Sequence, residues 1–127
     1  MSAVVYDSGA LIALGDQRNR TAFELHRDRI GRREKILVPA VVAAQVVRKP
    51  ATQVRLMRVL RGCELVPFAD HHVPVGQLLA ASGTADVVDA FVALLAARAG
   101  ALVISTDPDD IGRLLDCLGV QRPIFRL

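Results

Sequence analysis

Aromatic residues are scarce in this chain of 127 residues, which contains no Trp, one Tyr and four Phe. Proteins that hold single-stranded bases by stacking need several aromatic rings on one surface, so a stacking platform is not expected. Apolar runs are also short, since even the charge-free stretch at residues 36–47 falls below the ~18 residues that span a bilayer. The N-terminal segment has no basic region before Asp7, so we expect no secretory signal. We therefore expect a cytoplasmic location and no membrane partner.

Several kinds of catalytic motif are also missing. The two cysteines, Cys63 and Cys117, form no CxxC pair, and we expect both to be reduced, small core residues. His26, His71 and His72 have neither HExxH nor zinc-ligand spacing, and we expect the adjacent pair to be exposed. The chain has no glycine-rich phosphate loop and no GxSxG nucleophile elbow. These absences exclude the common zinc, nucleotide-binding and serine-hydrolase sites.

The composition that is present indicates one folded domain over residues 1–127. Hydrophobic residues make up 52% of the chain and charged residues 23%, which is enough apolar material for a core. Residues 18–61 carry twelve of the sixteen Lys and Arg against three acids, although the whole chain has a net charge of only +3. The sequence therefore predicts a basic surface beside a more acidic remainder.

Arginine provides most of this positive charge, because lysine occurs only at positions 35 and 49. Its planar guanidinium suits phosphate groups, so we expect Arg48, Arg55 and Arg58 to contact the phosphates of a nucleic acid. Arg55 and Arg58 are also spaced as neighbours on a helix. The alternative interpretation is that these arginines are charges on a solvated outer helix face.

Short strands and helices alternate along the chain. Apolar, β-branched runs predict strands at residues 3–6, 36–38, 64–67, 102–105 and 124–127, the last at an edge. Spacing and capping residues predict helices at 8–14, 21–30, 39–48, 51–60, 75–81, 85–99 and 107–118, with N-caps at Ser8 and Thr84. This alternation is typical of an α/β fold, in which helices cover both faces of a parallel sheet and sites form at the C-terminal ends of strands.

Aspartates are the candidates for chemistry. Asp7 and Asp107 each follow a predicted strand, and Asp86 and Asp89 lie three residues apart on one helix, so one crevice can collect them. Clustered carboxylates repel one another without a cation, and their oxygen atoms suit Mg²⁺ or Mn²⁺, either of which can activate water. Metal-assisted hydrolysis of a phosphodiester would account for the acids and the arginines together.

Each acid also has an ordinary structural interpretation. Asp7 fits a turn, Asp86 a charge at a helix start, and Asp107 an N-cap with Asp110 as its partner. Asp89 favours a function, because it lies more than a turn inside an otherwise apolar predicted helix, where a solvated carboxylate is least expected.

Four segments resemble the PIN-domain ribonucleases: VVYDSGALI at residues 4–12, VPAVVAAQVVR at 38–48, DVVDA at 86–90 and ISTDPDD at 104–110. The short, arginine-rich form is similar to a VapC toxin of a type II toxin–antitoxin system. The resemblance implies a three-layer α/β/α fold with a central, mostly parallel sheet. It also implies an Mg²⁺- or Mn²⁺-dependent endoribonuclease acting on structured RNA such as tRNA or rRNA, a homodimer, and inhibition by a cognate antitoxin protein.

Carried over by position, the catalytic, metal-binding acids of the family fall on Asp7, Asp89 and Asp107. Ser105 takes the place of the small hydroxyl residue before the last acid, and Asp86 and Asp110 match accessory acids that also serve as metal ligands. The second family acid, usually Glu, falls on Gln45, which brings no charge. Its amide is expected either to be buried and bonded to backbone or to point at the metal site.

Two other functions stay open. A phosphoacceptor receiver domain has a similar length and alternation, but it needs an acid pair near the first strand and a lysine after the last, and this chain has neither. A catalytically weak module that binds RNA or an antitoxin is the second alternative, because Gln45 leaves the expected acid set one charge short. A metal-dependent cleavage assay separates this module from the enzyme.

Overall fold

Five parallel strands form the centre of the fold. The computed structural model describes residues 2–127, and its strands are β1 (Ala3–Tyr6), β2 (Lys35–Pro39), β3 (Glu64–Val66), β4 (Leu102–Ser105) and β5 (Ile124–Arg126). They lie in the order β3-β2-β1-β4-β5, and every neighbouring pair is parallel. The chain first adds β2 and β3 on one side of β1 and then adds β4 and β5 on the other side. Such a reversal opens a crevice at the C-terminal ends of the central strands.

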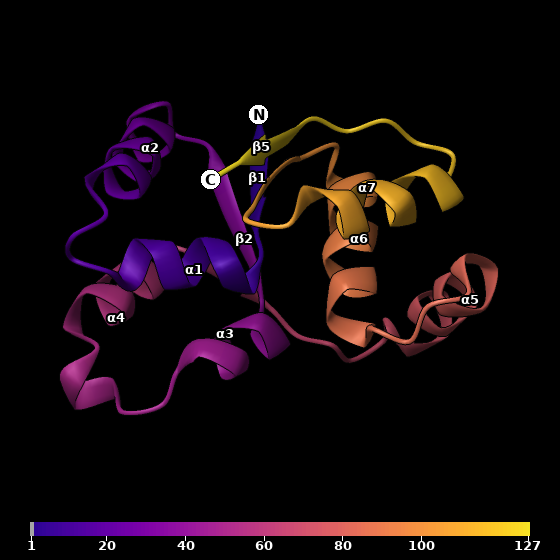
Figure 1. The fold of residues 1–127 in the computed structure, drawn as a ribbon, viewed down its shortest axis with the longest axis horizontal. Helices are drawn as coiled ribbons and strands as arrows, with labels where there is room; N and C mark the ends of the chain where they lie inside the picture. The colour runs from indigo at the N-terminus through magenta and orange to yellow at the C-terminus, as the bar shows by residue number, and fades with distance from the viewer. Residues whose placement is uncertain (1) are drawn as a thin grey trace.

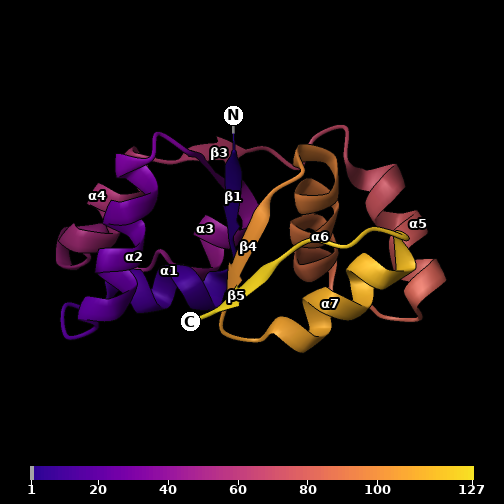
Figure 2. The same cartoon turned by 90° about the horizontal axis from the view of Figure 1, so that it is seen from above.

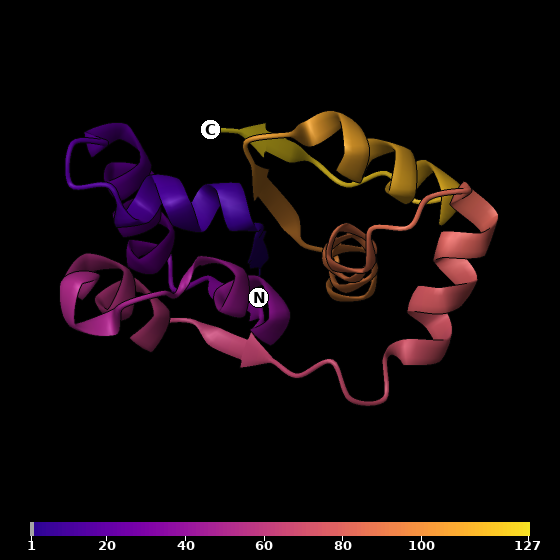
Figure 3. The ribbon, with the colours of Figure 1, turned by 60° about the horizontal axis from the view of Figure 1, so that its bottom comes forward.

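Helices cover both faces of this sheet. They are α1 (Ser8–Gly15), α2 (Arg20–Gly31), α3 (Ala40–Val46), α4 (Val54–Arg61), α5 (His72–Ser82), α6 (Val87–Ala99) and α7 (Pro108–Cys117), with a short 3₁₀ helix, η1 (Pro50–Thr52). Figures 1 and 3 show α1 to α4 on one face and α5 to α7 on the other. Seen from above, β1 and β4 run between the two helical layers (Figure 2). The predicted three-layer α/β/α fold is confirmed.

The core centres on β1 and α6. Val4 and Val5 of β1 are fully buried, and every residue from 90 to 96 in α6 is buried. A helix that is apolar all round must be enclosed by its neighbours, and α5, α7 and β1 provide that enclosure. Within residues 2–127, no single helix is long and apolar enough to cross a membrane, and α5 and α6 reach that length together only across a bend of 107°.

Both N-cap predictions are wrong by one or two residues. The N-cap of α1 is Asp7 rather than Ser8, and Asp7 Oδ1 accepts a hydrogen bond from the Ala10 N–H at 2.8 Å. The N-cap of α6 is Asp86 rather than Thr84, and Asp86 Oδ1 accepts from the Asp89 N–H at 3.0 Å. The prediction that Asp89 lies more than a turn inside this helix is therefore also wrong, because α6 begins at Val87 and Asp89 is in its first turn. Carboxylates cap helices as well as hydroxyl groups do, so two candidate site residues also begin helices.

The predicted helices at 39–48 and 51–60 differ most from the structure. Pro39 ends β2, α3 stops at Val46, and α4 begins only at Val54. The Gln53 side chain stabilises the break between the two helices. Its Oε1 accepts hydrogen bonds from the N–H groups of Arg48 at 2.8 Å and Lys49 at 3.1 Å, and its Nε2 donates one to the Val46 carbonyl at 2.9 Å. These bonds satisfy backbone groups that would otherwise continue a helix.

Two predictions about burial are also wrong. Cys63 and Cys117 are free thiols, as expected, but Cys63 is half-buried and Cys117 is exposed. Of the two histidines expected to be exposed, His72 is exposed, but His71 is half-buried against Phe91, with ring centroids 4.8 Å apart. Starting α5 at His72 places Pro74 in the first turn, where proline is tolerated.

Candidate active site

Asp7 and Ser105 join the ends of two neighbouring strands. Asp7 follows β1 and is 8% exposed, whereas Ser105 ends β4 and is fully buried. The Ser105 hydroxyl donates a hydrogen bond to Asp7 Oδ2, and its oxygen accepts one from the Asp107 N–H at 2.9 Å. A continuous polar chain therefore runs from Asp7 through Ser105 to the backbone of Asp107.

Asp107 leaves its carboxylate free. It is the N-cap residue of α7, but its side chain makes no capping hydrogen bond, and the residue is exposed. Burial raises the pKa of Asp7, whereas hydrogen bonds from Ser105 and the Ala10 N–H oppose that rise. The charge of Asp107 also raises the pKa of Asp7, which shows that the two carboxylates share one electrostatic environment.

A second group of acids lies along α6 and α7. Asp86, Asp89 and Asp110 line a cleft of about 160 Å³, and the other lining residues are Thr84, Ala85, Arg113 and Leu114. The pKa of Asp89 is raised to about 6, mainly by partial burial and then by the nearby charges of Asp86, Asp110 and Asp7 in that order. The Asp89 carboxylate is therefore repelled both by the acids of the cleft and by Asp7.

Arg113 also lines this cleft, although the sequence analysis did not predict it as a site residue. Arg113 Nη2 lies 3.5 Å from Asp110 Oδ1, and both side chains are largely exposed. Their spacing of three residues on α7 is the signal that identifies such a pair. Arg113 is the cationic partner of Asp110 only. Within the described residues, the other four candidate acids form no ion pair: Asp7, Asp86, Asp89 and Asp107.

The donor set fits a hard divalent ion in its chemistry, because it consists of carboxylate oxygens. The raised pKa of Asp89 comes partly from neighbouring negative charges, and a cation would relieve that repulsion. Across residues 2–127, however, no three His, Cys, Asp or Glu side chains come close enough to hold one ion together. The carboxylates would have to draw together around a bound ion.

Gln45 lies on the last turn of α3 and is exposed. The interpretation that its amide is buried and bonded to backbone is therefore wrong. Gln45 is not among the residues that line the cleft beside Asp89. Its role toward a metal stays a prediction.

The three arginines selected as RNA contacts occupy two different places. Arg48 donates from Nη1 to the carbonyls of Ala44 at 3.0 Å and Val47 at 2.8 Å, and so completes the C-terminus of α3. The Arg55 guanidinium lies 4.1 Å from the centre of the Phe23 ring, in a cation–π contact. Arg55 and Arg58 therefore belong to a different surface from Arg48.

That surface is a groove of about 540 Å³ between α2 and α4, which we call the α2/α4 groove. Its lining residues are Gln17, Phe23, His26, Arg27, Ile30, Val54, Arg55, Arg58 and Val59. Ile30 and Val54 are 48% and 51% exposed, so its apolar part is open to solvent. The groove thus combines an apolar floor with three arginines.

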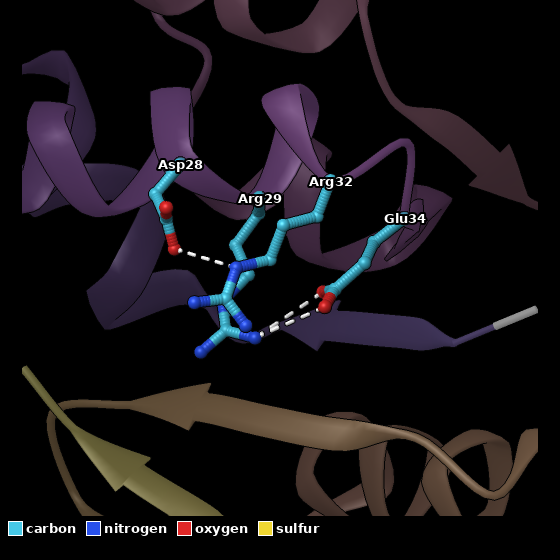
Figure 4. A network of polar contacts seen from close by, with 4 residues as sticks. All are labelled: Asp28, Arg29, Arg32 and Glu34. Carbon is cyan, nitrogen blue, oxygen red and sulfur yellow. Dashed lines mark hydrogen bonds and ion pairs between the residues drawn. The ribbon is translucent and has the colours of Figure 1, made fainter.

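Two other arginines, one in α2 and one at its C-cap, form ion pairs with nearby acids. Figure 4 shows Arg29 directed at Glu34 and Arg32 directed at Asp28, with ion pairs of 3.1 Å each. In contrast, Arg27, Arg55 and Arg58 form no ion pair within the described residues. Arg27, Arg55 and Arg58 therefore give the α2/α4 groove positive charge that no carboxylate of the described residues neutralises.

Comparison with known proteins agrees with this arrangement. The PIN domain family matches residues 4–114. The fold is similar to the crystal structure of PAE2754 from Pyrobaculum aerophilum, with a TM-score of 0.63 and 18% identity over 98% of this chain and 83% of that chain. No curated protein sequence matches the chain. PIN domains are usually nucleases and generally use divalent metals. With its acids at the C-terminal ends of β1 and β4 and a family match over most of its length, the chain belongs to the PIN-domain family.

Proposed function

We propose that this protein is a divalent-metal-dependent endoribonuclease and the toxin of a type II toxin–antitoxin pair. The observation that carries the hydrolytic part is the chain from Asp7 through Ser105 to Asp107, with the charge of Asp89 coupled to Asp7. In a PIN domain, acids grouped at this edge of the sheet support hydrolysis of a nucleic-acid backbone.

Asp7, Asp89 and Asp107 would hold Mg²⁺ or Mn²⁺, with Asp86 and Asp110 adding negative charge beside them. The ion supplies an activated water and charge stabilisation at phosphorus. The chain's own residues prepare that arrangement. Ser105 and the Ala10 N–H fix both oxygens of the Asp7 carboxylate, so its orientation is set before a ligand arrives.

RNA is the proposed substrate because the chain offers unpaired arginines but few aromatic rings. Arg27, Arg55 and Arg58 lack acidic partners in the described chain, and arginine contacts phosphate groups well. Structured RNA, such as tRNA or rRNA, is recognised mostly by shape and backbone contacts. A structured RNA is therefore the substrate class that these residues suit.

The α2/α4 groove supports an antitoxin as partner. Its exposed apolar residues and three arginines suit an amphipathic peptide segment that carries acidic side chains. We propose that the cognate antitoxin places such a segment here, and that two toxin chains form a homodimer. Competition between this segment and RNA for the groove arginines would contribute to inhibition.

The first experiment measures cleavage of a structured RNA by the purified chain. We expect cleavage with Mg²⁺ or Mn²⁺, no cleavage with EDTA, and a loss of at least about 100-fold in Asp89→Asn. Asp116→Asn is the matched control, because Asp116 is exposed near the far end of α7. Cleavage that persists in EDTA contradicts the metal-dependent mechanism. RNA binding without cleavage favours the catalytically weak binding module that Gln45 suggests.

The second experiment tests the groove. Replacing Arg55 and Arg58 together by Gln should lower the slope of log affinity for RNA against log salt by about one to two units. The same variant should weaken binding of the antitoxin. Arg18→Gln with Arg33→Gln is the control, since both residues are exposed and neither lines the groove. An unchanged salt slope places the RNA elsewhere, and unchanged antitoxin affinity contradicts the groove as its binding site.

A further inference from the structure

Thr106 packs against Gly9. Thr106 is the first residue after β4, and Gly9 is the second residue of α1. A Cβ atom on Gly9 would lie 1.8 Å from Thr106 Oγ1, 2.9 Å from its Cβ and 3.0 Å from its Cγ2. Non-bonded heavy atoms do not approach so closely. The Thr106 side chain therefore occupies the space that a side chain at residue 9 would need.

The glycine is required here by close packing rather than by backbone conformation. Gly9 lies inside α1 and is not one of the glycines with positive φ, which are Gly83, Gly100 and Gly119. Glycine within a helix weakens it relative to alanine. The missing Cβ is instead what admits Thr106 to the first turn of α1.

This contact bears on Asp107, the next residue along the chain. The Asp107 carboxylate makes no capping hydrogen bond, so its placement depends on the backbone of the residues before it. Ser105 is hydrogen-bonded to Asp7, and the side chain of the exposed residue Thr106 fills the space beside Gly9 that a Cβ would need. The connection from β4 to α7 thus meets the segment that begins α1 at two successive residues.

We propose that Thr106 is a positioning residue of the acidic site, and that its side chain, seated against Gly9, fixes the backbone of Asp107 relative to Asp7. Thr106 acts through this backbone and not on the substrate. The inference rests on the proposed function of the same acids. It adds two residues, Gly9 and Thr106, whose fit to each other determines how the acids are spaced.

Gly9→Ala is the central variant, because the new Cβ must displace Thr106. We expect kcat for RNA cleavage to fall on the order of 100-fold, with little change in KM, since a shift near 1 Å at a reacting group has effects of that size. Calorimetric titration with Mn²⁺ should also show weaker binding. Adding Thr106→Gly to Gly9→Ala removes the obstruction, so both quantities should recover relative to Gly9→Ala alone. Such non-additivity is expected only of residues in contact.

Two further variants separate packing from chemistry and keep the test valid if Gly9→Ala does not fold. Thr106→Val retains the branched shape without the hydroxyl and should keep nearly wild-type kcat and Mn²⁺ affinity, whereas Thr106→Gly should lower both. Gly15→Ala is the matched control on α1, since its Cβ would lie 3.5 Å from Leu56, an ordinary contact. Thermal unfolding without metal shows whether each variant is folded.

Several results would overturn the role of Thr106. These are equal kcat and Mn²⁺ affinity for wild type and a folded Gly9→Ala, additive effects of Gly9→Ala and Thr106→Gly, or a Thr106→Val variant as impaired as Thr106→Gly. A wild-type protein without metal-dependent cleavage would instead contradict the proposed function. Because the wild type is measured first, the two failures are distinguishable.

Discussion

Ser105 and Asp7 are 98 positions apart in the sequence, and a buried hydrogen bond joins the Ser105 hydroxyl to Asp7 Oδ2. The pairing of β1 with β4 produces this contact, because Tyr6 and Ile104 are partners in the sheet and the residues that follow them, Asp7 and Ser105, enter the site. The second bond of Ser105, from the Asp107 N–H, extends the contact to the start of α7.

Replacing Ser105 should therefore affect both stability and activity. In Ser105→Ala, Asp7 loses a buried partner and the Asp107 N–H loses its acceptor, which should lower the free energy of unfolding by about 1–3 kcal/mol. Cleavage should fall by about 10- to 100-fold, because the Asp7 carboxylate is no longer oriented. Urea unfolding and cleavage rates measure the two effects. Ser82→Ala, at the end of α5, is the matched control, and equal behaviour of the two variants would show that the Ser105 bonds are not needed.

Removing the charge of Asp89 should have opposite effects on stability and activity. Its pKa is raised to about 6 by burial and by neighbouring carboxylates, so the folded state binds this proton more tightly than the unfolded chain. The contribution of Asp89 to stability is therefore favourable below that pH and is lost as the pH rises through 6.

Asp89→Asn should consequently raise the free energy of unfolding in EDTA at pH 7 by about 1 kcal/mol, after allowance for solvent screening. The same variant should lose cleavage. Thermal unfolding with and without Mg²⁺ checks both points, because added Mg²⁺ should stabilise the wild type more than the variant. If Asp89→Asn were less stable than the wild type without metal, the neighbouring carboxylates would not be repelling Asp89.

His26 should make the fold sensitive to mild acid. It is 4% exposed, and its Nδ1 shares a hydrogen bond of 2.7 Å with the Tyr6 hydroxyl. Burial lowers the pKa of His26 below its usual 6.5, so the unfolded chain takes up this proton first. The stability linked to a neutral His26 is complete above pH 6.5 and decreases as the pH falls below it.

The contribution of His26 to the free energy of unfolding should thus decrease from pH 7 to pH 5, opposite in sign to the contribution of Asp89 over the same interval. His26→Phe should lack this decrease and so gain stability relative to the wild type as the pH falls, measured by urea unfolding at each pH. His72→Gln, at an exposed position, should keep the wild-type slope. If both variants show the same slope, His26 is not the titrating group.

Gln45 occupies the position at which the PIN-domain family usually has Glu, so restoring that acid tests whether residue 45 faces the metal. An exposed residue on the last turn of α3 accepts Glu without steric conflict, and a further carboxylate near the site would attract a divalent ion more strongly. Gln45→Glu should therefore tighten Mg²⁺ or Mn²⁺ binding in calorimetry, while Gln45→Ala should cost far less activity than Asp89→Ala. Equal metal affinities for wild type and Gln45→Glu, with the fold intact, would show that residue 45 does not face the metal.

Much of the fold was predictable because its signals are local. Alternating apolar runs located all five strands, and glycine located the ends of α5 and α6, where Gly83 and Gly100 adopt the left-handed conformation that favours it. Helix beginnings were less predictable, since Asp, Ser and Thr all cap well and only the backbone path selects among Asp7, Ser8 and later residues. The interruption after α3 depends on the Gln53 side chain, and no periodic pattern reports such a bond.

The sequence by itself determined which groups are available for chemistry: four aspartates placed after strands or at helix starts, a fifth, Asp89, inside an apolar helix, and arginines concentrated before residue 62. Only the tertiary structure decided which of them meet. Parallel pairing of β1 with β4 brings Ser105 to Asp7 and Thr106 to Gly9. Packing of α2 and α4 against α1 leaves a groove lined by Arg27, Arg55 and Arg58. These contacts join residues that are far apart along the chain. Their distances follow from strand register and helix packing, which depend on the whole core rather than on any local pattern.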